Sequence, residues 1–67
     1  MPVLNTVDLT GVSGQSWAAA AKEALSEATK TIRNVRKMDI VSTSAVVEDG
    51  VITEYLTEVR IFFEVDR

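Results

Sequence analysis

The last part of the chain, residues 51–65, alternates with the period of two that is typical of a β-strand, and both of its faces carry apolar side chains. One face holds Val51, Thr53, Tyr55, Thr57, Val59, Ile61, Phe63 and Val65. The opposite face holds Ile52, Leu56 and Phe62 among Glu54, Glu58, Arg60 and Glu64. The first face predicts a hydrophobic core. Because a solvated surface does not require large apolar groups, we predict that Ile52, Leu56 and Phe62 lie in a contact between identical copies.

The length of the chain supports the same expectation. A chain of 67 residues buries only about 60% of its unfolded surface, so it has little stability to spare as a monomer. It contains no cysteine and no histidine, which excludes a disulfide framework and argues against a structural zinc site. Association with further copies of itself is the remaining source of stability that the sequence offers.

Charge and hydropathy restrict the partners. The formal net charge is −3 and the sequence pI is about 4.7, which argues against general affinity for nucleic acid or for an anionic membrane. The sequence has neither a leader-like segment nor an apolar run of about 18 residues. We therefore predict a cytoplasmic, soluble protein with one domain over residues 1–67.

The first half of the sequence predicts a strand and then a helix. Residues 3–9 alternate as a strand does, and Thr10-Gly11 is expected to end it. Ser13 or Ser16 is a candidate cap for the helix that follows. The apolar stripe of this helix is formed by Trp17, Ala21, Leu25 with Ala24, Ala28 and Ile32. We predict that Trp17 packs in the core and that Lys30, Arg33 and Arg36 complement the helix dipole at its carboxyl end.

After Val35 the apolar period changes from near four to two, which predicts a second strand. In it, Met38, Ile40, Ser42, Ser44 and Val46 are expected on one face and Asp39, Val41, Thr43, Ala45 and Val47 on the other. Glu48-Asp49-Gly50 is a hairpin signal joining this strand to the last one. The predicted fold class is α+β, in β-α-β-β order, with a three-stranded antiparallel sheet curled over one amphipathic helix.

Several segments together resemble the dodecin family. They are Val7-Asp8-Leu9-Thr10-Gly11-Val12-Ser13, the helix run from Ser16-Trp17 to Ala21, Thr31-Ile32-Arg33-Asn34-Val35, and the closing strand from Glu54-Tyr55 to Phe63. The resemblance covers nearly the whole chain. It implies a hollow homododecamer of cubic symmetry built from trimers. It also implies a protein that stores or sequesters flavins, riboflavin or its phosphate (FMN), stacked in pairs at two-fold interfaces.

Two flavin contacts of that family are replaced. Flavin-binding dodecins carry a tryptophan that stacks on the isoalloxazine ring where this chain has Lys37, and a glutamine that contacts the flavin's polar edge where it has Leu56. Because an ammonium on a flexible stem has no flat apolar face, we predict weak flavin binding and no tightly bound cofactor. Arg36 and Lys37, with Lys30 and Arg33, form a basic group that holds either a ligand phosphate or acidic partners in ion pairs.

Two further alternatives concern function. When repeated by symmetry, Glu54, Glu58 and Glu64 are candidate ligands for calcium or magnesium; otherwise they pair with Arg60 or face solvent. No histidine or cysteine is present and no serine has a recognisable base beside it, so we predict no enzymatic activity. The sequence leaves two functions open: a homo-oligomeric shell that binds and stores small ligands, or a structural or ion-binding shell without an organic ligand.

Overall fold

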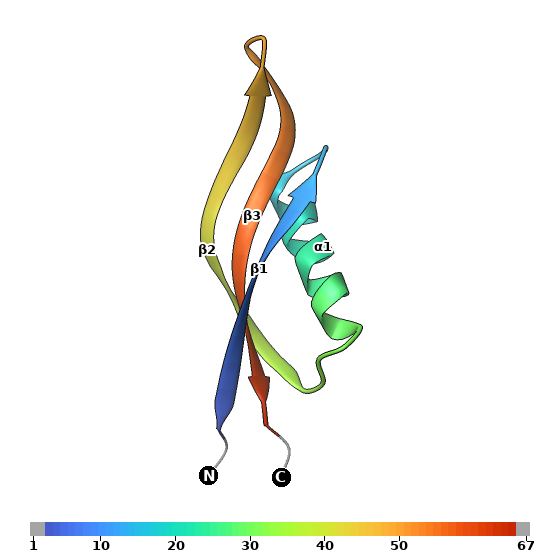
Figure 1. Cartoon of the computed structure of the whole chain (residues 1–67), viewed down its shortest axis with the longest axis vertical. Coiled ribbons are helices and arrows are strands. Elements are labelled where there is room, and N and C mark those ends of the chain that lie inside the picture. The colour runs from blue at the N-terminus through green and yellow to red at the C-terminus, as the bar shows by residue number, and fades with distance from the viewer. Residues whose placement is uncertain (1–2, 66–67) are drawn as a thin grey trace.

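The computed structural model describes residues 3–65. Residues 1–2 and 66–67, which the predicted single domain also includes, lie outside this range. Strand β1 spans Leu4–Ser13, helix α1 Trp17–Thr29, strand β2 Val35–Glu48 and strand β3 Val51–Glu64. The β-α-β-β order is confirmed, with the helix lying on one side of the sheet (Figure 1).

The sheet is antiparallel throughout and has the order β1-β3-β2, so β3 is its central strand. In the middle of the sheet, Ile61 lies opposite Val7 on one side and Met38 on the other. The predicted hairpin is confirmed between β2 and β3. Asp49 and Gly50 both have left-handed backbones, with φ of 51° and 75°, which is the conformation that a tight two-residue hairpin turn requires.

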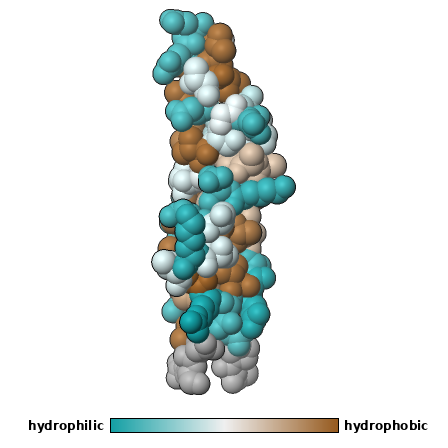
Figure 2. Space-filling view, turned by 90° about the vertical axis from the view of Figure 1, so that its right-hand side faces the viewer, coloured by the Kyte–Doolittle hydropathy of each residue, from teal (hydrophilic) through white to brown (hydrophobic). Residues whose placement is uncertain are grey.

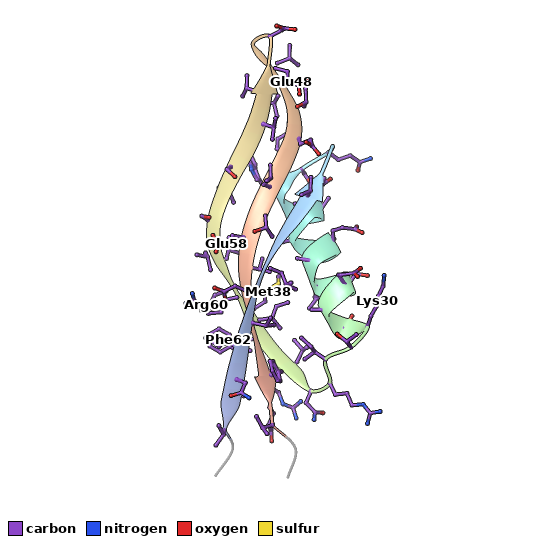
Figure 3. The ribbon with its side chains drawn as sticks, viewed as in Figure 1. Lys30, Met38, Glu48, Glu58, Arg60 and Phe62 are labelled. Atoms are coloured by element: carbon purple, nitrogen blue, oxygen red, sulfur yellow. The ribbon has the colours of Figure 1, made fainter. Side chains whose placement is uncertain are left out.

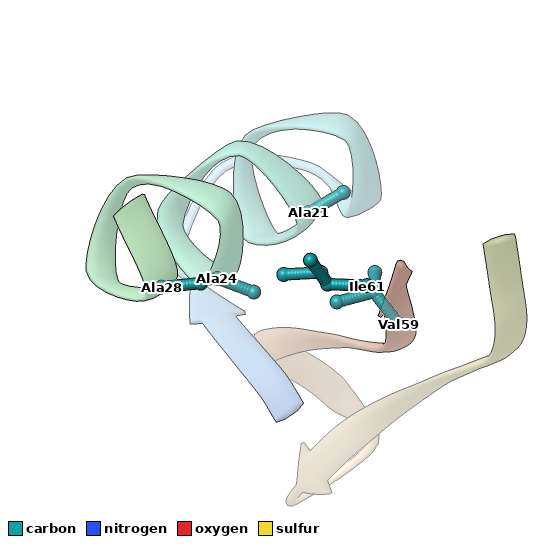
Figure 4. Packing of buried hydrophobic residues seen from close by; sticks show 5 residues of the cluster. All are labelled: Ala21, Ala24, Ala28, Val59 and Ile61. Atoms are coloured by element: carbon teal, nitrogen blue, oxygen red, sulfur yellow. The ribbon is translucent and has the colours of Figure 1, made fainter. Parts of the chain in front are cut away.

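The core lies between α1 and the face of the sheet that we call the inner face. Val59 and Ile61 of β3 are fully buried there, and they pack against Ala21, Ala24 and Ala28 of the helix (Figure 4). Small side chains on α1 allow its backbone to approach the sheet closely. The apolar alternation of β3 is therefore confirmed as the core signal where the helix covers it.

Close helix packing also explains why β1 is longer than predicted. The expectation that Thr10-Gly11 ends the strand was wrong, because β1 continues to Ser13. Gly11 lies against the helix, and a Cβ at this position would overlap the backbone carbonyl of Ala20 and approach the Ala24 nitrogen. The glycine is thus required for contact between two elements, and it does not break the strand.

Helix α1 begins after the second of the two predicted cap candidates, Ser13 and Ser16. Ser16 is its N-cap, and the Ser16 hydroxyl accepts a hydrogen bond of 3.0 Å from the Ala19 N–H. Helix α1 has 13 residues. No helix within residues 3–65 is long and apolar enough to cross a membrane.

The predicted end of the helix was wrong. α1 ends at Thr29, no basic residue lies in its last turn, and Arg36 belongs to β2. Asn34 adopts a left-handed backbone with φ of 61°, and the chain then enters β2. Ile32 lies outside the helix but still packs against the core. Ile32 continues the apolar spacing of the helix because it contacts the core from the segment that connects α1 to β2.

Strand β2 does not keep the strict alternation that its sequence predicted. Its register against β3 shifts between Val35 and Lys37, between Ile40 and Ser42, and between Val46 and Val47. These irregularities insert extra residues. Met38 and Ile40 consequently lie on the inner face, whereas Ser42 and Ser44 pair with residues of β3 whose side chains point to the opposite face.

The β2–β3 hairpin extends well beyond the helix, and we call residues 46–54 the hairpin arm (Figure 1). The molecule measures 51 × 19 × 13 Å. Val51 and Thr53, which were predicted to lie in the core, are exposed in the arm because α1 does not reach them. Hydrophobic residues extend along much of the molecule in the space-filling view, including its hairpin end (Figure 2).

Candidate functional site

The face of the sheet opposite α1, which we call the outer face, is not covered by any other element of residues 3–65. Glu58, Arg60 and Phe62 point away from the helix, whereas Met38 points toward it (Figure 3). Residues that lie opposite one another on the three strands form four rows: Thr6, Phe62 and Lys37; Asp8, Arg60 and Asp39; Thr10, Glu58 and Ser42; Val12, Leu56 and Ser44. The face therefore combines a charged centre with apolar groups on either side of it.

Lys37 contacts an aromatic ring directly. The Lys37 ammonium lies 4.2 Å from the centroid of the Phe62 ring, a cation–π contact. The same ammonium is 3.4 Å from a carboxylate oxygen of Asp39. Where the family resemblance implies a stacking tryptophan, this chain has Lys37, and the Lys37 ammonium covers the ring of the half-buried Phe62.

The neighbouring basic residue is also paired. The Arg36 Nε donates a hydrogen bond of 2.8 Å to Glu64 Oε2. Arg36 lies at the irregularity between Val35 and Lys37, where β2 gains one residue relative to β3. Of the basic group predicted from sequence, Arg36, Lys37 and Lys30 thus each have a carboxylate partner, Lys30 pairing with Glu27 at 2.9 Å.

The centre of the outer face is an ion pair across two strands. Arg60 on β3 donates two hydrogen bonds to Asp8 on β1, of 2.9 and 3.2 Å. The hydrogen bonds and the positive charge of Arg60 lower the pKa of Asp8. The same hydrogen bonds and the negative charge of Asp8 raise the pKa of Arg60. Arg60 is thus held by β1, and its expected pairing with a glutamate on its own strand face is not its main contact.

The two positions aligned with the flavin contacts are far apart in one chain. Lys37 lies beside Phe62, and Leu56 is six residues away from Phe62 along β3, roughly 20 Å in an extended strand. One small ligand cannot lie against both positions of the same chain. A site that uses both must be formed between two copies.

The three glutamates proposed as metal ligands are also separated. They lie along one strand at spacings of four and six residues, and Glu64 is already bound by Arg36. Glu58 accepts a hydrogen bond of 3.2 Å from the Ser42 hydroxyl. The part of the chain that the structure describes contains no cluster of three metal-ligating side chains. A site at Glu54, Glu58 and Glu64 stays a prediction that depends on neighbouring copies.

The three predicted contact residues lie on the outer face, and β1 adds two that sequence reasoning missed. Ile52 is exposed, while Leu56 and Phe62 are half-buried. Leu4 and Val12 are exposed on the same face. In the alternation of β1, Leu4 lies on the face that does not carry Val7 and Leu9. The sequence therefore already indicated an apolar residue on the outer face.

The prediction that Trp17 packs in the core was wrong, since 42% of it is exposed. Its indole N–H donates a hydrogen bond of 2.8 Å to the Ser44 carbonyl of the edge strand β2. The ring meets Tyr55 edge to face, with 4.9 Å between centroids. The helix buries Ala20, Ala21, Ala24 and Ala28. Trp17 is the first residue of α1 and lies at the border of that buried stripe.

The chain is similar to known proteins in its sequence and in its fold. The family model described as Dodecin matches residues 3–66. No curated protein sequence matches the chain. A point mutant of the dodecin from T. thermophilus overlays with a TM-score of 0.95 at 24% identity and full coverage of both chains.

Two further solved structures have the same fold. The dodecin from Streptomyces davaonensis has a TM-score of 0.93 at 20% identity, covering 98% of this chain and 97% of its own. The dodecin from Streptomyces coelicolor has a TM-score of 0.94 at 17% identity, covering 98% and 94%. At these identities the structural matches establish the fold, and the family model establishes the relationship.

Proposed function

The chain belongs to the dodecin family, and from this premise we propose that its copies form a closed homododecameric shell that binds small ligands between subunits. The shell is a cytoplasmic binding and storage protein without catalytic activity, and it has no nucleic-acid or membrane partner. The uncovered outer face is the observation that carries this proposal, because it holds apolar residues that the chain itself leaves unburied.

The dimensions of the chain support assembly. Its radius of gyration is 13.8 Å, whereas a compact domain of this length has a value of about 11 Å. The difference arises because α1 covers only one face of the sheet. In the described part of the chain, neither face of the hairpin arm is packed against a second layer. Additional copies would supply the missing second layer.

Replacement of Leu56 or Phe62 by Asp tests the assembly. A carboxylate that is buried without a partner costs several kcal/mol, so both variants should dissociate, with a lower mass by light scattering. Ser26→Asp, on the exposed side of α1, is the matched control and should keep the native mass. A native protein that is a folded monomer near 7 kDa at micromolar concentration, or variants of unchanged mass, would contradict the proposal.

The ligand site that we propose lies around Lys37 and Phe62, where a second copy meets the outer face. Flavin is the ligand class implied by the family, but Lys37 covers the Phe62 ring at 4.2 Å and competes with a stacked isoalloxazine ring. We expect weak binding of riboflavin. FMN should bind better, because the Lys37 ammonium suits a phosphate.

Flavin fluorescence quenching provides the measurement. The double variant Lys37→Trp with Leu56→Gln should bind riboflavin more tightly, because each aromatic stack adds about 0.5–1.5 kcal/mol beyond its area. Lys37→Gln is the control that removes the charge without adding a stacking surface. Tight riboflavin binding by the unmodified chain, or no gain in the double variant, would remove Lys37 and Leu56 as the cause of weak binding.

One observation favours the second function, an ion-binding or purely structural shell. Glu54 and Glu58 form no ion pair with any residue between 3 and 65, so their carboxylates are available to calcium or magnesium at a symmetry axis. Calorimetric titration of the assembly with each cation tests this function. Glu54→Gln and Glu58→Gln should abolish any heat of binding, whereas Glu23→Gln should not.

A further inference from the structure

A second apolar surface lies on the inner side of the molecule, beside the core. α1 packs mainly on β1 and β3 and barely contacts β2, which leaves a groove of about 390 Å³ between the helix and β2. It is lined by Trp17, Ala18, Ala21, Lys22, Met38, Ile40, Thr43 and Thr57. Ile40 is 54% exposed there, so the groove is an open apolar surface adjoining the core.

The hairpin arm carries the other large set of uncovered apolar side chains. Val47 and Val51 are 59% and 61% exposed, and Ile52 beside them is exposed too. The arm extends beyond α1 (Figure 1). The arm therefore presents a narrow apolar ridge that no other segment within residues 3–65 covers.

Charge distinguishes the two surfaces. Lys22 lines the groove and has no carboxylate within ion-pair distance in the described part of the chain. The turn at the end of the arm carries Glu48 and Asp49, which are also exposed and outside the ion pairs of residues 3–65. A cation thus lines the apolar groove, and two carboxylates lie at the end of the apolar ridge.

The arm cannot fill the groove of its own chain. Val51 lies four residues beyond Tyr55, roughly 13 Å along β3, and it is Tyr55 that contacts Trp17. Helix α1 runs away from the hairpin end (Figure 1), so Lys22 is farther still from Asp49. Any arm that enters the groove belongs to another copy.

We propose that the groove between α1 and β2 receives the hairpin arm of a second copy, with Val51 against Trp17 and Ile40 and with Lys22 facing Glu48 and Asp49. The two surfaces differ, so the contact runs head to tail, and repetition gives a ring where the rotation between copies closes. It differs from the outer-face contact, which is formed around Leu56 and Phe62. The inference rests on the proposed assembly and deepens it by naming the segments that meet.

Engineered cysteines test the contact, because the chain has none of its own. The double variant Lys22→Cys with Asp49→Cys has one cysteine on each side of the contact. On oxidation it should give a ladder of covalently linked chains beyond the dimer, whereas each single variant can give dimers at most. Lys22→Cys with Asp39→Cys is the matched control, since Asp39 lies on the outer face, and it should give no ladder.

Fluorescence of Trp17, the single tryptophan, gives an independent readout. Val51→Asp changes an exposed residue of the arm, so the chain should still fold. Its emission should shift to the red and iodide quenching should increase, because the groove of the neighbouring copy is vacated. Ser26→Asp, on the exposed side of α1, should leave the Trp17 emission unchanged.

The outcomes separate this inference from the proposed assembly. A native protein that is monomeric at micromolar concentration overturns both. An intact oligomer without a cysteine ladder, or with Trp17 emission insensitive to Val51→Asp, overturns the arm-in-groove contact alone.

Discussion

The two faces of β3 differ although they belong to one strand. On the inner face, Val59 and Ile61 are fully buried under α1. On the outer face, Phe62 is half-buried beneath a lysine and Arg60 is exposed in an ion pair. One helix buries the central strand of a single face of the sheet. The other face depends on a partner, so the stability of the fold and the stability of the assembly are carried by different residues of the same strand.

The largest effect on the inner face should come from Gly11. Gly11→Val adds side-chain atoms where even a Cβ would overlap the Ala20 carbonyl. Because a helix backbone cannot yield as a side chain does, we expect a cost at or above the upper end of the usual overpacking range, about 3 kcal/mol. Soluble expression and the denaturant midpoint provide the measurement.

Gly14 is the matched control for this change. A Cβ at Gly14 would meet no atom within 4 Å, so Gly14→Ala should change the free energy of unfolding by no more than about 0.5 kcal/mol. If Gly11→Val and the unmodified chain had the same denaturant midpoint, α1 would not pack as closely on β1 as the structure indicates.

Two isoleucines of β3 differ in burial and should differ in their contribution to stability. Ile61→Ala removes a fully buried side chain and should lower the free energy of unfolding by about 2–5 kcal/mol. Ile52→Ala makes the same change in the hairpin arm, where 45% of the residue is exposed. Chemical denaturation at low protein concentration, where assembly contributes least, should show a much smaller loss for Ile52→Ala. Equal losses would mean that the two faces are not independent.

Periodicity predicted the fold because burial under a single helix imposes it directly. β3 and the Asp49-Gly50 hairpin followed from local pattern, as did the Ser16 cap. The bulges of β2 and the left-handed Asn34 depend on how distant strands meet, and an unaligned sequence carries no clear signal for them. Ile32 was assigned to the helix because an apolar residue in a loop can contact the core and mimic helical spacing.

The candidate site was predicted less completely. The family resemblance pointed to Lys37 and Leu56 as the positions aligned with the flavin contacts, but it did not reveal that Phe62 lies directly under Lys37. That contact depends on the extra residue at Arg36, which sets the register of β2 against β3. Trp17 was misplaced for a related reason. Its helical spacing was correct, but the helix packs toward β1 and β3 and leaves its first residue facing the edge of β2.

The cation–π contact offers a smaller test on the outer face. The side chain of Lys37 is 56% exposed, and contacts of this kind at exposed sites are worth about 0.5–1 kcal/mol. Lys37→Gln and Phe62→Leu should each lose stability, and the double variant should lose less than the sum. Thermal unfolding of all four chains gives this coupling energy. Additive losses would mean that Lys37 and Phe62 do not interact in solution.

The smallest expected effect concerns the Asp8–Arg60 pair and depends on pH. Arg60 lowers the pKa of Asp8 below its ordinary value of 3.8 in the folded chain. The folded state thus binds a proton at Asp8 less readily than the unfolded state does. The contribution of the pair is fully present above pH 3.8 and is lost as the pH falls through the lowered value in the folded state.

Asp8→Asn removes that titration. At neutral pH the variant should be slightly less stable than the native chain, because exposed ion pairs contribute little, and the difference should shrink as the solution is acidified below pH 3.8. Melting temperatures of both chains across this range provide the measurement, with Glu23→Gln on the exposed side of α1 as the control. A stability difference that stays constant with pH would place the role of Asp8 in packing between β1 and β3, and the charged centre of the outer face would then contribute nothing through its ionisation.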